Sequence, residues 1–255
     1  MIDRGLVATF PDCHACARLR CGPAAVCLAC ASGRITRPAP GACPVCAQRR
    51  AADGCCPNEL CRSPGRRISR IHAIGYQAGP LRRAIYSYKY GGTRSWCVIF
   101  GRLLAAWLEQ NMAADPPGLI VANPTFTGCP GAAGEPGPRF AHTEAVLRAA
   151  ADADRGLRWP FDTATPATIV KTRATLRSAD AQAWSKRVTG AELSDAIEVT
   201  DPDRTAGRFV LVYDDICATG SQLDAVAGCL LDEGGAARVE GIVLARAPWR
   251  GGLNA

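Results

Sequence analysis

Beyond residue 68, hydrophobic residues fall into short runs that predict β-strands. The clearest run is Phe209–Tyr213, which consists of apolar and aromatic residues without helical spacing and is typical of a strand buried on both faces. Similar runs predict strands over 69–77, 119–122, 167–172 and 239–245.

Between these runs, hydrophobic residues recur with the spacing of an α-helix. A core-facing helix is predicted over 95–112, whose hydrophobic positions are Val98, Ile99, Leu103, Leu104, Trp107 and Leu108. Shorter helices are expected over 81–90, 140–151 and 180–189. An amphipathic helix starts near Leu223 and stops at the pair Gly234–Gly235, so that the run 239–245 closes a strand–helix–strand unit.

Two acids and a turn of small residues join the Phe209 strand to the helix that follows it. The acids are Asp214 and Asp215, and the turn consists of Ile216, Cys217, Ala218, Thr219, Gly220 and Ser221. A turn leading into a helix offers free N–H groups and the positive end of the helix dipole to a phosphate. Adjacent acids suit vicinal hydroxyls such as those of ribose. The stretch therefore predicts a site for a phosphorylated sugar; the alternative is a strand end with solvated acids.

Length and composition set the class of protein. The chain has 255 residues, of which 48% are hydrophobic, enough for one large domain or a domain with a small module. No run of about 18 uncharged apolar residues occurs, so we expect no membrane span. The start contains Asp3 and only a short apolar run, which argues against a signal peptide, and we expect a cytoplasmic protein.

The net charge of +7 lies wholly in the first 70 residues. They contain 11 arginines and 4 acids, whereas residues 71–255 contain 19 basic and 19 acidic side chains. Two metal ions, each held by four thiolates, would reduce the surplus to about +3. The surplus fits either an ordinary solvated surface or a module that faces nucleic acid.

Ten of the 14 cysteines lie between Cys13 and Cys61. C-x-x-C pairs aim two sulfurs at one tetrahedral ion, so the spacing predicts one or two structural zinc sites. The simplest ligand sets are Cys13, Cys16, Cys27 and Cys30 for one site, and Cys43, Cys46, Cys56 and Cys61 for the other. Cys55 could replace Cys56, and interleaved ligation is a further alternative. A cytoplasmic setting disfavours disulfides.

Few large apolar residues occur in this segment, so it needs metal to fold. We therefore divide the chain into a Cys-rich zinc-binding module over 10–65 and a larger domain over 66–250.

The stretch from Phe209 to Ser221 resembles the motif with which type I phosphoribosyltransferases bind phosphoribosyl pyrophosphate (PRPP). Residues 76–85 (YQAGPLRRAI) and 88–92 (YKYGG) resemble two further motifs. With the cysteine pairs in front, this order resembles the ComF (competence protein F) family over roughly Cys13 to Ala247. The resemblance implies an α/β fold: a type I phosphoribosyltransferase-like parallel sheet flanked by helices, after a small zinc-binding module.

The resemblance also implies residue roles. In that family the two acids hold the ribose hydroxyls and the turn holds the 5-phosphate, which assigns Asp214 and Asp215 to ribose and residues 216–221 to phosphate. Magnesium accompanies PRPP. Candidates for pyrophosphate or lid contacts are Lys89, Asn123, Lys171 and Arg173, although Lys89 could instead be a solvated helix end.

Some positions depart from the family pattern. Where the family has a V-P-V-P run, Val121-Ala122-Asn123-Pro124 lacks one proline. After Phe140, the family's Asn and Gln are replaced by Ala141 and His142. We interpret His142 as a surface residue of the helix that begins here. No feature identifies an acceptor base.

Two functions are consistent with these patterns. The first is a PRPP-binding, phosphoribosyltransferase-like protein of the ComF type that supports DNA uptake, with competence-machinery proteins as partners. The alternative is a non-catalytic accessory protein that keeps the fold and binds single-stranded nucleic acid. The complete PRPP motif favours the first function, and the basic Cys-rich module favours the second.

Overall fold

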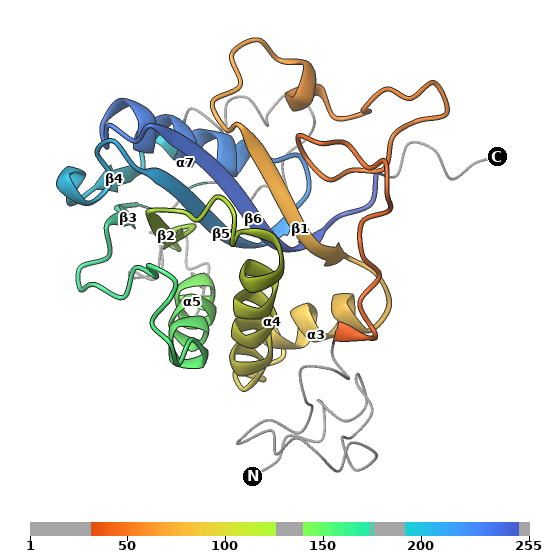
Figure 1. Ribbon diagram of the computed structural model, residues 1–255, viewed down its shortest axis with the longest axis horizontal. Helices are drawn as coiled ribbons and strands as arrows, with labels where there is room; N and C mark the ends of the chain where they lie inside the picture. The colour runs from red at the N-terminus through yellow and green to blue at the C-terminus, as the bar shows by residue number, and fades with distance from the viewer. Residues whose placement is uncertain (1–31, 126–139, 174, 176–191, 250–255) are drawn as a thin grey trace.

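The computed structural model describes residues 32–125, 140–173, 175 and 192–249 (Figure 1). The predicted metal ligands Cys13, Cys16, Cys27 and Cys30 and the predicted helix over 180–189 lie outside these residues.

Four parallel strands form the main sheet, in the order β1-β6-β5-β2. These strands are β1 (Arg70–Tyr76), β2 (Leu119–Ala122), β5 (Phe209–Cys217) and β6 (Arg238–Arg246). Each confirms a strand predicted from the hydrophobic runs. Because parallel strands all end at the same edge, the residues that follow β2 and β5 come together there.

Strand β5 is longer than the hydrophobic run predicted. It includes both acids, and it continues with Ile216 opposite Ala245 and Cys217 opposite Arg246 of β6. The prediction that the turn begins at Ile216 is therefore wrong by two residues. Pairing with the equally long β6 keeps the backbone extended, so the turn proper is the β5–α7 loop, residues 218–220.

Helices cover both faces of the sheet (Figure 1). On one face lie α3 (Gly79–Lys89), α4 (Trp96–Asn111) and α5 (His142–Ala153), and on the other lies α7 (Ser221–Asp232). Alternate residues of β5 face opposite layers: Leu211 and Tyr213 pack with α3, α4 and α5, whereas Val210 and Val212 pack with α7. This burial on both faces explains why the run lacks polar residues.

A second, smaller sheet lies beside α7. It pairs β3 (Ile169–Lys171) with β4 (Ile197–Val199) in antiparallel orientation, and β4 contacts α7. A short 3-10 helix, η3 (Pro202–Arg204), then leads towards β5. The predicted strand over 167–172 is thus confirmed, outside the main sheet.

The described part of the Cys-rich segment, residues 32–65, runs along β1 at the edge of the main sheet (Figure 1). The N–H of Ile71 donates to the carbonyl of Val45 at 2.6 Å, and the N–H of Tyr76 donates to that of Thr36 at 2.7 Å. These bonds cover an edge strand whose N–H groups would otherwise be unpaired. The segment also contains the short 3-10 helix η2 (Glu59–Arg62).

Among the helices of the described residues, none combines the length and the apolar character needed to cross a bilayer.

Candidate functional site

The two predicted ribose-binding acids lie near the carboxyl end of β5 and are buried. Asp214 is 6% exposed and Asp215 is 4% exposed. This burial excludes the alternative interpretation of solvated acids at a strand end. Two buried neighbouring carboxyl groups require compensating donors or cations.

Two basic side chains from different helices contact Asp215. The Lys89 ammonium, at the end of α3, lies 2.7 Å from Asp215 Oδ2. His142 Nε2, at the start of α5, lies 3.1 Å from the same oxygen. The interpretation of Lys89 as a solvated helix end is therefore excluded. The interpretation of His142 as a surface residue is wrong, because its side chain is only 16% exposed and contacts the buried acid.

Asn123 connects the end of β2 to Asp214. Its side-chain amide donates to Asp214 Oδ2 at 2.9 Å, and its backbone N–H donates to the carbonyl of Tyr213 at 2.7 Å. The N–H of Asp215 donates to Asp214 Oδ1 at 2.8 Å. The structure thus joins Asn123, Asp214, Asp215 and Lys89, which are far apart in sequence, and adds His142 to them.

The surroundings of the two acids move their pKa values in opposite directions. Burial, followed by the nearby Asp215 carboxylate, raises the pKa of Asp214 to about 7. Burial also opposes ionisation of Asp215, but the cation of Lys89 and the hydrogen bond from His142 outweigh it and hold the Asp215 pKa below its usual range. Asp215 is therefore a stable carboxylate, whereas Asp214 readily binds a proton near neutral pH.

The β5–α7 loop has the conformation that its glycine allows. Gly220 has φ +91°, and a Cβ there would lie 2.8 Å from Ile71 Cδ1 and 2.9 Å from Leu60 Cδ2. Thr219 Oγ1 and Ser221 Oγ are 3.0 Å apart, and Ser221 is the first residue of α7. Two hydroxyls, a close backbone and a helix N-terminus therefore coincide, as the sequence predicted.

Two residues that hold this loop were not among the sequence candidates. Arg246, fully buried at the end of β6, donates to the carbonyls of Cys217, at 2.7 Å, and Ala218. Asn58 donates from its side-chain amide to the carbonyl of Thr219 at 2.9 Å. Neither residue falls within a recognisable motif, and the available signal for Arg246 was its position directly after the apolar run Ile242–Ala245.

The remaining predicted residues of the phosphate and lid group do not reach the acids. Lys171 donates to Thr175 Oγ1 at 2.6 Å, and Arg173 donates to the carbonyl of Glu192 at 3.4 Å. Burial, followed by the charge of Arg173, lowers the pKa of Lys171. In the described part of the chain, these two cations thus belong to the surroundings of the small β3–β4 sheet.

The four-cysteine cluster consists of Cys43, Cys46, Cys56 and Cys61. Their sulfur atoms all lie within 4.8 Å of one another, with 3.8 Å between Cys43 and Cys61 and 3.6 Å between Cys46 and Cys56. Four thiolates about 2.3 Å from a tetrahedral ion are roughly 3.8 Å apart. The cluster is therefore close enough to bind one metal ion. The exposed Cys55 lies outside the cluster, so Cys56 and not Cys55 is the fourth candidate ligand.

The surroundings of the cluster shift the pKa values of its thiols in different directions. Burial opposes ionisation of Cys46, but the nearby Arg246 guanidinium and several hydrogen bonds lower its pKa to about 7. Burial raises the pKa of Cys56 to about 11, and burial with the hydrogen bond to Cys46 raises that of Cys61. Without a metal, Cys56 and Cys61 are therefore thiols near neutral pH, and a divalent ion bound by all four sulfurs would displace their protons.

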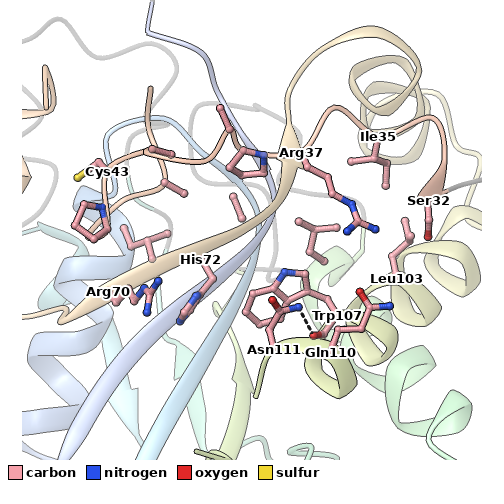
Figure 2. Close-up of a pocket in the computed structure, with 18 of the residues that line it drawn as sticks. Ser32, Ile35, Arg37, Cys43, Arg70, His72, Leu103, Trp107, Gln110 and Asn111 are labelled. Carbon is pink, nitrogen blue, oxygen red and sulfur yellow. Dashed lines mark hydrogen bonds between the residues drawn. The ribbon is translucent and has the colours of Figure 1, made fainter. Parts of the chain in front are cut away.

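A cavity of about 440 Å³ lies between the Cys-rich segment, β1 and α4 (Figure 2). The side chains that line the cavity include Arg37, Arg70, His72 and Trp107. The ring centroids of His72 and Trp107 are 5.1 Å apart, and His72 Nε2 is 2.7 Å from Glu240 Oε2. Of the predicted site residues that the structure describes, only Cys43 lines this cavity, so the cavity shares no residue with the acid pair.

A scan of protein-family models finds no match to this chain, and a search of curated proteins finds none either.

Proposed function

We propose that this chain is a PRPP-binding, phosphoribosyltransferase-like protein of the ComF type. The observation that carries the proposal is the buried acid pair of β5, which is followed within one short loop by the N-terminus of α7 and is contacted by Lys89, Asn123 and His142. The parallel sheet flanked by helices supports a phosphoribosyltransferase-like fold. The resemblance to ComF adds DNA uptake as the setting of the activity.

In this proposal, different residues bind the ribose and the 5-phosphate of PRPP. The ribose hydroxyls donate to Asp214 and Asp215, whose carboxylate oxygens retain lone pairs beyond those used within the protein. The 5-phosphate accepts hydrogen bonds from the N–H groups of the β5–α7 loop and from the hydroxyls of Thr219 and Ser221. Lys89 and His142 fix Asp215 as a carboxylate in the correct position.

In the proposed reaction a nucleophilic atom of an acceptor forms a bond to the ribose C1 carbon as the bond from C1 to the pyrophosphate oxygen breaks, and pyrophosphate leaves with that electron pair. Positive charge develops on the sugar and is stabilised by the fixed carboxylate of Asp215, so the protein needs no covalent nucleophile. Carboxylate oxygens are suitable ligands for magnesium, which would neutralise pyrophosphate when bound with PRPP.

We further infer that the four-cysteine cluster holds a structural Zn²⁺. All four positions of a tetrahedral site are taken by sulfur, which leaves no open position for catalysis. Zinc content per chain, compared between Cys56→Ser and Cys55→Ser, tests the assignment. We expect loss of one zinc in the first variant alone.

Calorimetric titration of PRPP with magnesium tests the main proposal. We compare the wild type with the double variant Asp214→Asn/Asp215→Asn and expect affinity to fall by about 100-fold or more, because two hydrogen bonds to charged groups are lost. Asp232→Asn is the matched control, since this exposed acid at the end of α7 pairs with Arg67. Absence of binding by the folded, zinc-loaded wild type would reject the proposal.

One observation favours the second function, binding of single-stranded nucleic acid. Tyr86 on α3 and Tyr90 directly after its end are 67% and 66% exposed, and their ring centroids are 5.1 Å apart. The exposed Arg82 and Arg83 lie one turn earlier, and the helix carries no acid. Exposed aromatic rings beside cations form a stacking platform for bases.

Fluorescence anisotropy with a labelled single-stranded DNA tests this second function. The variant Tyr86→Ala/Tyr90→Ala is expected to weaken binding about tenfold or more, whereas Tyr86→Phe/Tyr90→Phe keeps the rings and the affinity. Binding should also weaken as salt rises. Equal affinity of the alanine and phenylalanine variants would reject a role for this surface.

A further inference from the structure

Arg246 is a fully buried cation with no carboxylate partner among the described residues. Its relative exposure is 0%. Its guanidinium donates to the carbonyls of Cys217 and Ala218 on one side, and its Nη2 lies 3.7 Å from Cys46 Sγ on the other. A buried charge requires an opposite charge nearby. In the described structure, the group that can supply it is the four-cysteine cluster.

The position of Arg246 connects two parts of the molecule that are far apart in sequence. Four thiolates around one divalent ion carry a net charge of about −2, which balances a buried guanidinium. The other end of the same guanidinium fixes the two carbonyls where β5 passes into the β5–α7 loop. The metal site and the loop therefore share a single side chain.

Asn58 makes a second connection, from a position between the ligands Cys56 and Cys61. Its side chain is 2% exposed; the amide nitrogen donates to the carbonyl of Thr219 at 2.9 Å, and the amide oxygen accepts from the N–H of Leu60 at 3.3 Å. Leu60 itself packs against Gly220, the residue with positive φ. The knuckle that contains two metal ligands thus touches the loop directly.

We propose that metal binding at the four-cysteine cluster holds the β5–α7 loop in its phosphate-binding conformation, with Arg246 as the positioning residue. The consequence for ligand affinity rests on the proposed function, whereas the effect on the loop does not. Without the metal, the segment carrying Cys46 and Asn58 loses its cross-link, and Arg246 loses much of the negative charge opposite it. The loop then loses the two contacts that fix its carbonyls.

Adjacent cysteines provide a matched test in the full-length chain. Cys56→Ser removes a ligand of the cluster, whereas Cys55→Ser changes an exposed neighbour with the same chemistry. For each variant we measure zinc per chain, amide hydrogen exchange over residues 216–221, and the affinity for ribose 5-phosphate. Amide exchange reports on the loop whether or not any ligand binds.

We expect Cys56→Ser to lose one zinc per chain and to exchange amides of the loop about tenfold faster or more, as loss of a charge-assisted hydrogen bond implies. Its affinity for ribose 5-phosphate should fall by a similar factor. Cys55→Ser should match the wild type in all three measurements. Loss of zinc with unchanged loop exchange would overturn the proposal.

Arg246→Gln keeps all four cysteines. It therefore tests the coupling between the metal site and the loop even if Cys56→Ser fails to fold. It should retain zinc yet show faster exchange over 216–221, and Arg238→Gln, at the start of the same strand, is its control. Unchanged loop exchange in Arg246→Gln would also overturn the proposal. If the wild type binds neither ribose 5-phosphate nor PRPP, the proposed function fails, and the exchange comparison still decides whether metal site and loop are coupled.

Discussion

At the scale of single residues, Asp214 and Asp215 are neighbours in sequence with opposite surroundings. Asp215 contacts the cation of Lys89 and the ring of His142, whereas Asp214 accepts hydrogen bonds from neutral amides. Environment therefore separates two chemically identical side chains into a stable carboxylate and a carboxyl group that binds a proton readily. This difference leads to two predictions.

Replacing Asp214 by Asn should stabilise the protein, and more so at high pH. The folded state holds the Asp214 proton up to about pH 7, whereas the unfolded chain releases it near pH 4. Between these values the folded state binds more protons, so the contribution of Asp214 to stability falls as pH rises. We expect Asp214→Asn to raise the free energy of unfolding by about 1–3 kcal/mol at pH 8 and by less at pH 5.

Urea denaturation at both pH values measures this difference. Asp232→Asn, which changes an exposed acid, should show no comparable dependence on pH. An equal effect of Asp214→Asn at pH 5 and pH 8 would contradict a raised pKa for Asp214.

Removing the cation beside Asp215 should destabilise the protein. Lys89→Met leaves a carboxylate that is buried with less compensation, at a cost of about 2–4 kcal/mol. Adding Asp215→Asn should recover part of this loss, so the double variant is more stable than the sum of the two single changes implies. Chemical denaturation of the four proteins measures the coupling, and strictly additive losses would show that the pair does not interact.

At the scale of elements, β5, the β5–α7 loop and α7 form one continuous unit whose geometry depends on a single glycine. Gly220 combines a positive φ with close contacts on the side where a Cβ would stand. Gly207 has φ +69° but open space around it. Comparing alanine substitutions at the two glycines therefore distinguishes the energetic cost of backbone strain from that of steric contact.

Gly220→Ala should lower the free energy of unfolding by about 2–4 kcal/mol, whereas Gly207→Ala should lower it by about 1 kcal/mol. The additional loss comes from displacement of Ile71 and Leu60. Gly220→Ala should also weaken ribose 5-phosphate binding, while Gly207→Ala leaves it unchanged. Thermal melts and calorimetry measure both effects, and equal melting temperatures of the two variants would reject the steric argument.

At the scale of the whole molecule, the Cys-rich segment and the sheet share hydrogen bonds at several places. Residues 36–45 bond to β1, the side chain of Gln48 donates to the carbonyl of Ala247 at 3.1 Å, and Asn58 donates to Thr219. The side chain of Arg246 lies between the cluster and β5. A division of the chain at residue 65 therefore separates groups that satisfy one another.

A fragment of residues 66–249 should fail to fold, because it leaves these buried donors, acceptors and one cation unpaired. A fragment of residues 32–249 keeps all of these contacts and should give a cooperative melt with zinc present. Circular dichroism during heating distinguishes the two fragments. A cooperative transition in the shorter fragment would show that the larger domain is independent of the Cys-rich segment.

Patterns of neighbouring residues predict much of the chain's secondary structure and part of its chemistry. Hydrophobic periodicity located the four main strands and most helices because buried runs and amphipathic helices are patterns of neighbouring residues. Spacing selected Cys43, Cys46, Cys56 and Cys61, with Cys55 as the alternative to Cys56, because a metal knuckle is a local motif. The two acids before the Thr219–Ser221 turn were also recognisable as a local pattern.

Only the tertiary structure decided which distant groups meet. His142 and Lys89 converge on Asp215 because two helices end at the same edge of the sheet, and no pattern along the chain encodes that convergence. The choice of Cys56 over Cys55 depends on the path of the chain between knuckles. Arg246 lies between the cluster and the loop because β6 pairs with β5 and ends beside Cys46. Periodicity reports burial, whereas partners across the molecule follow from how its strands and helices pack.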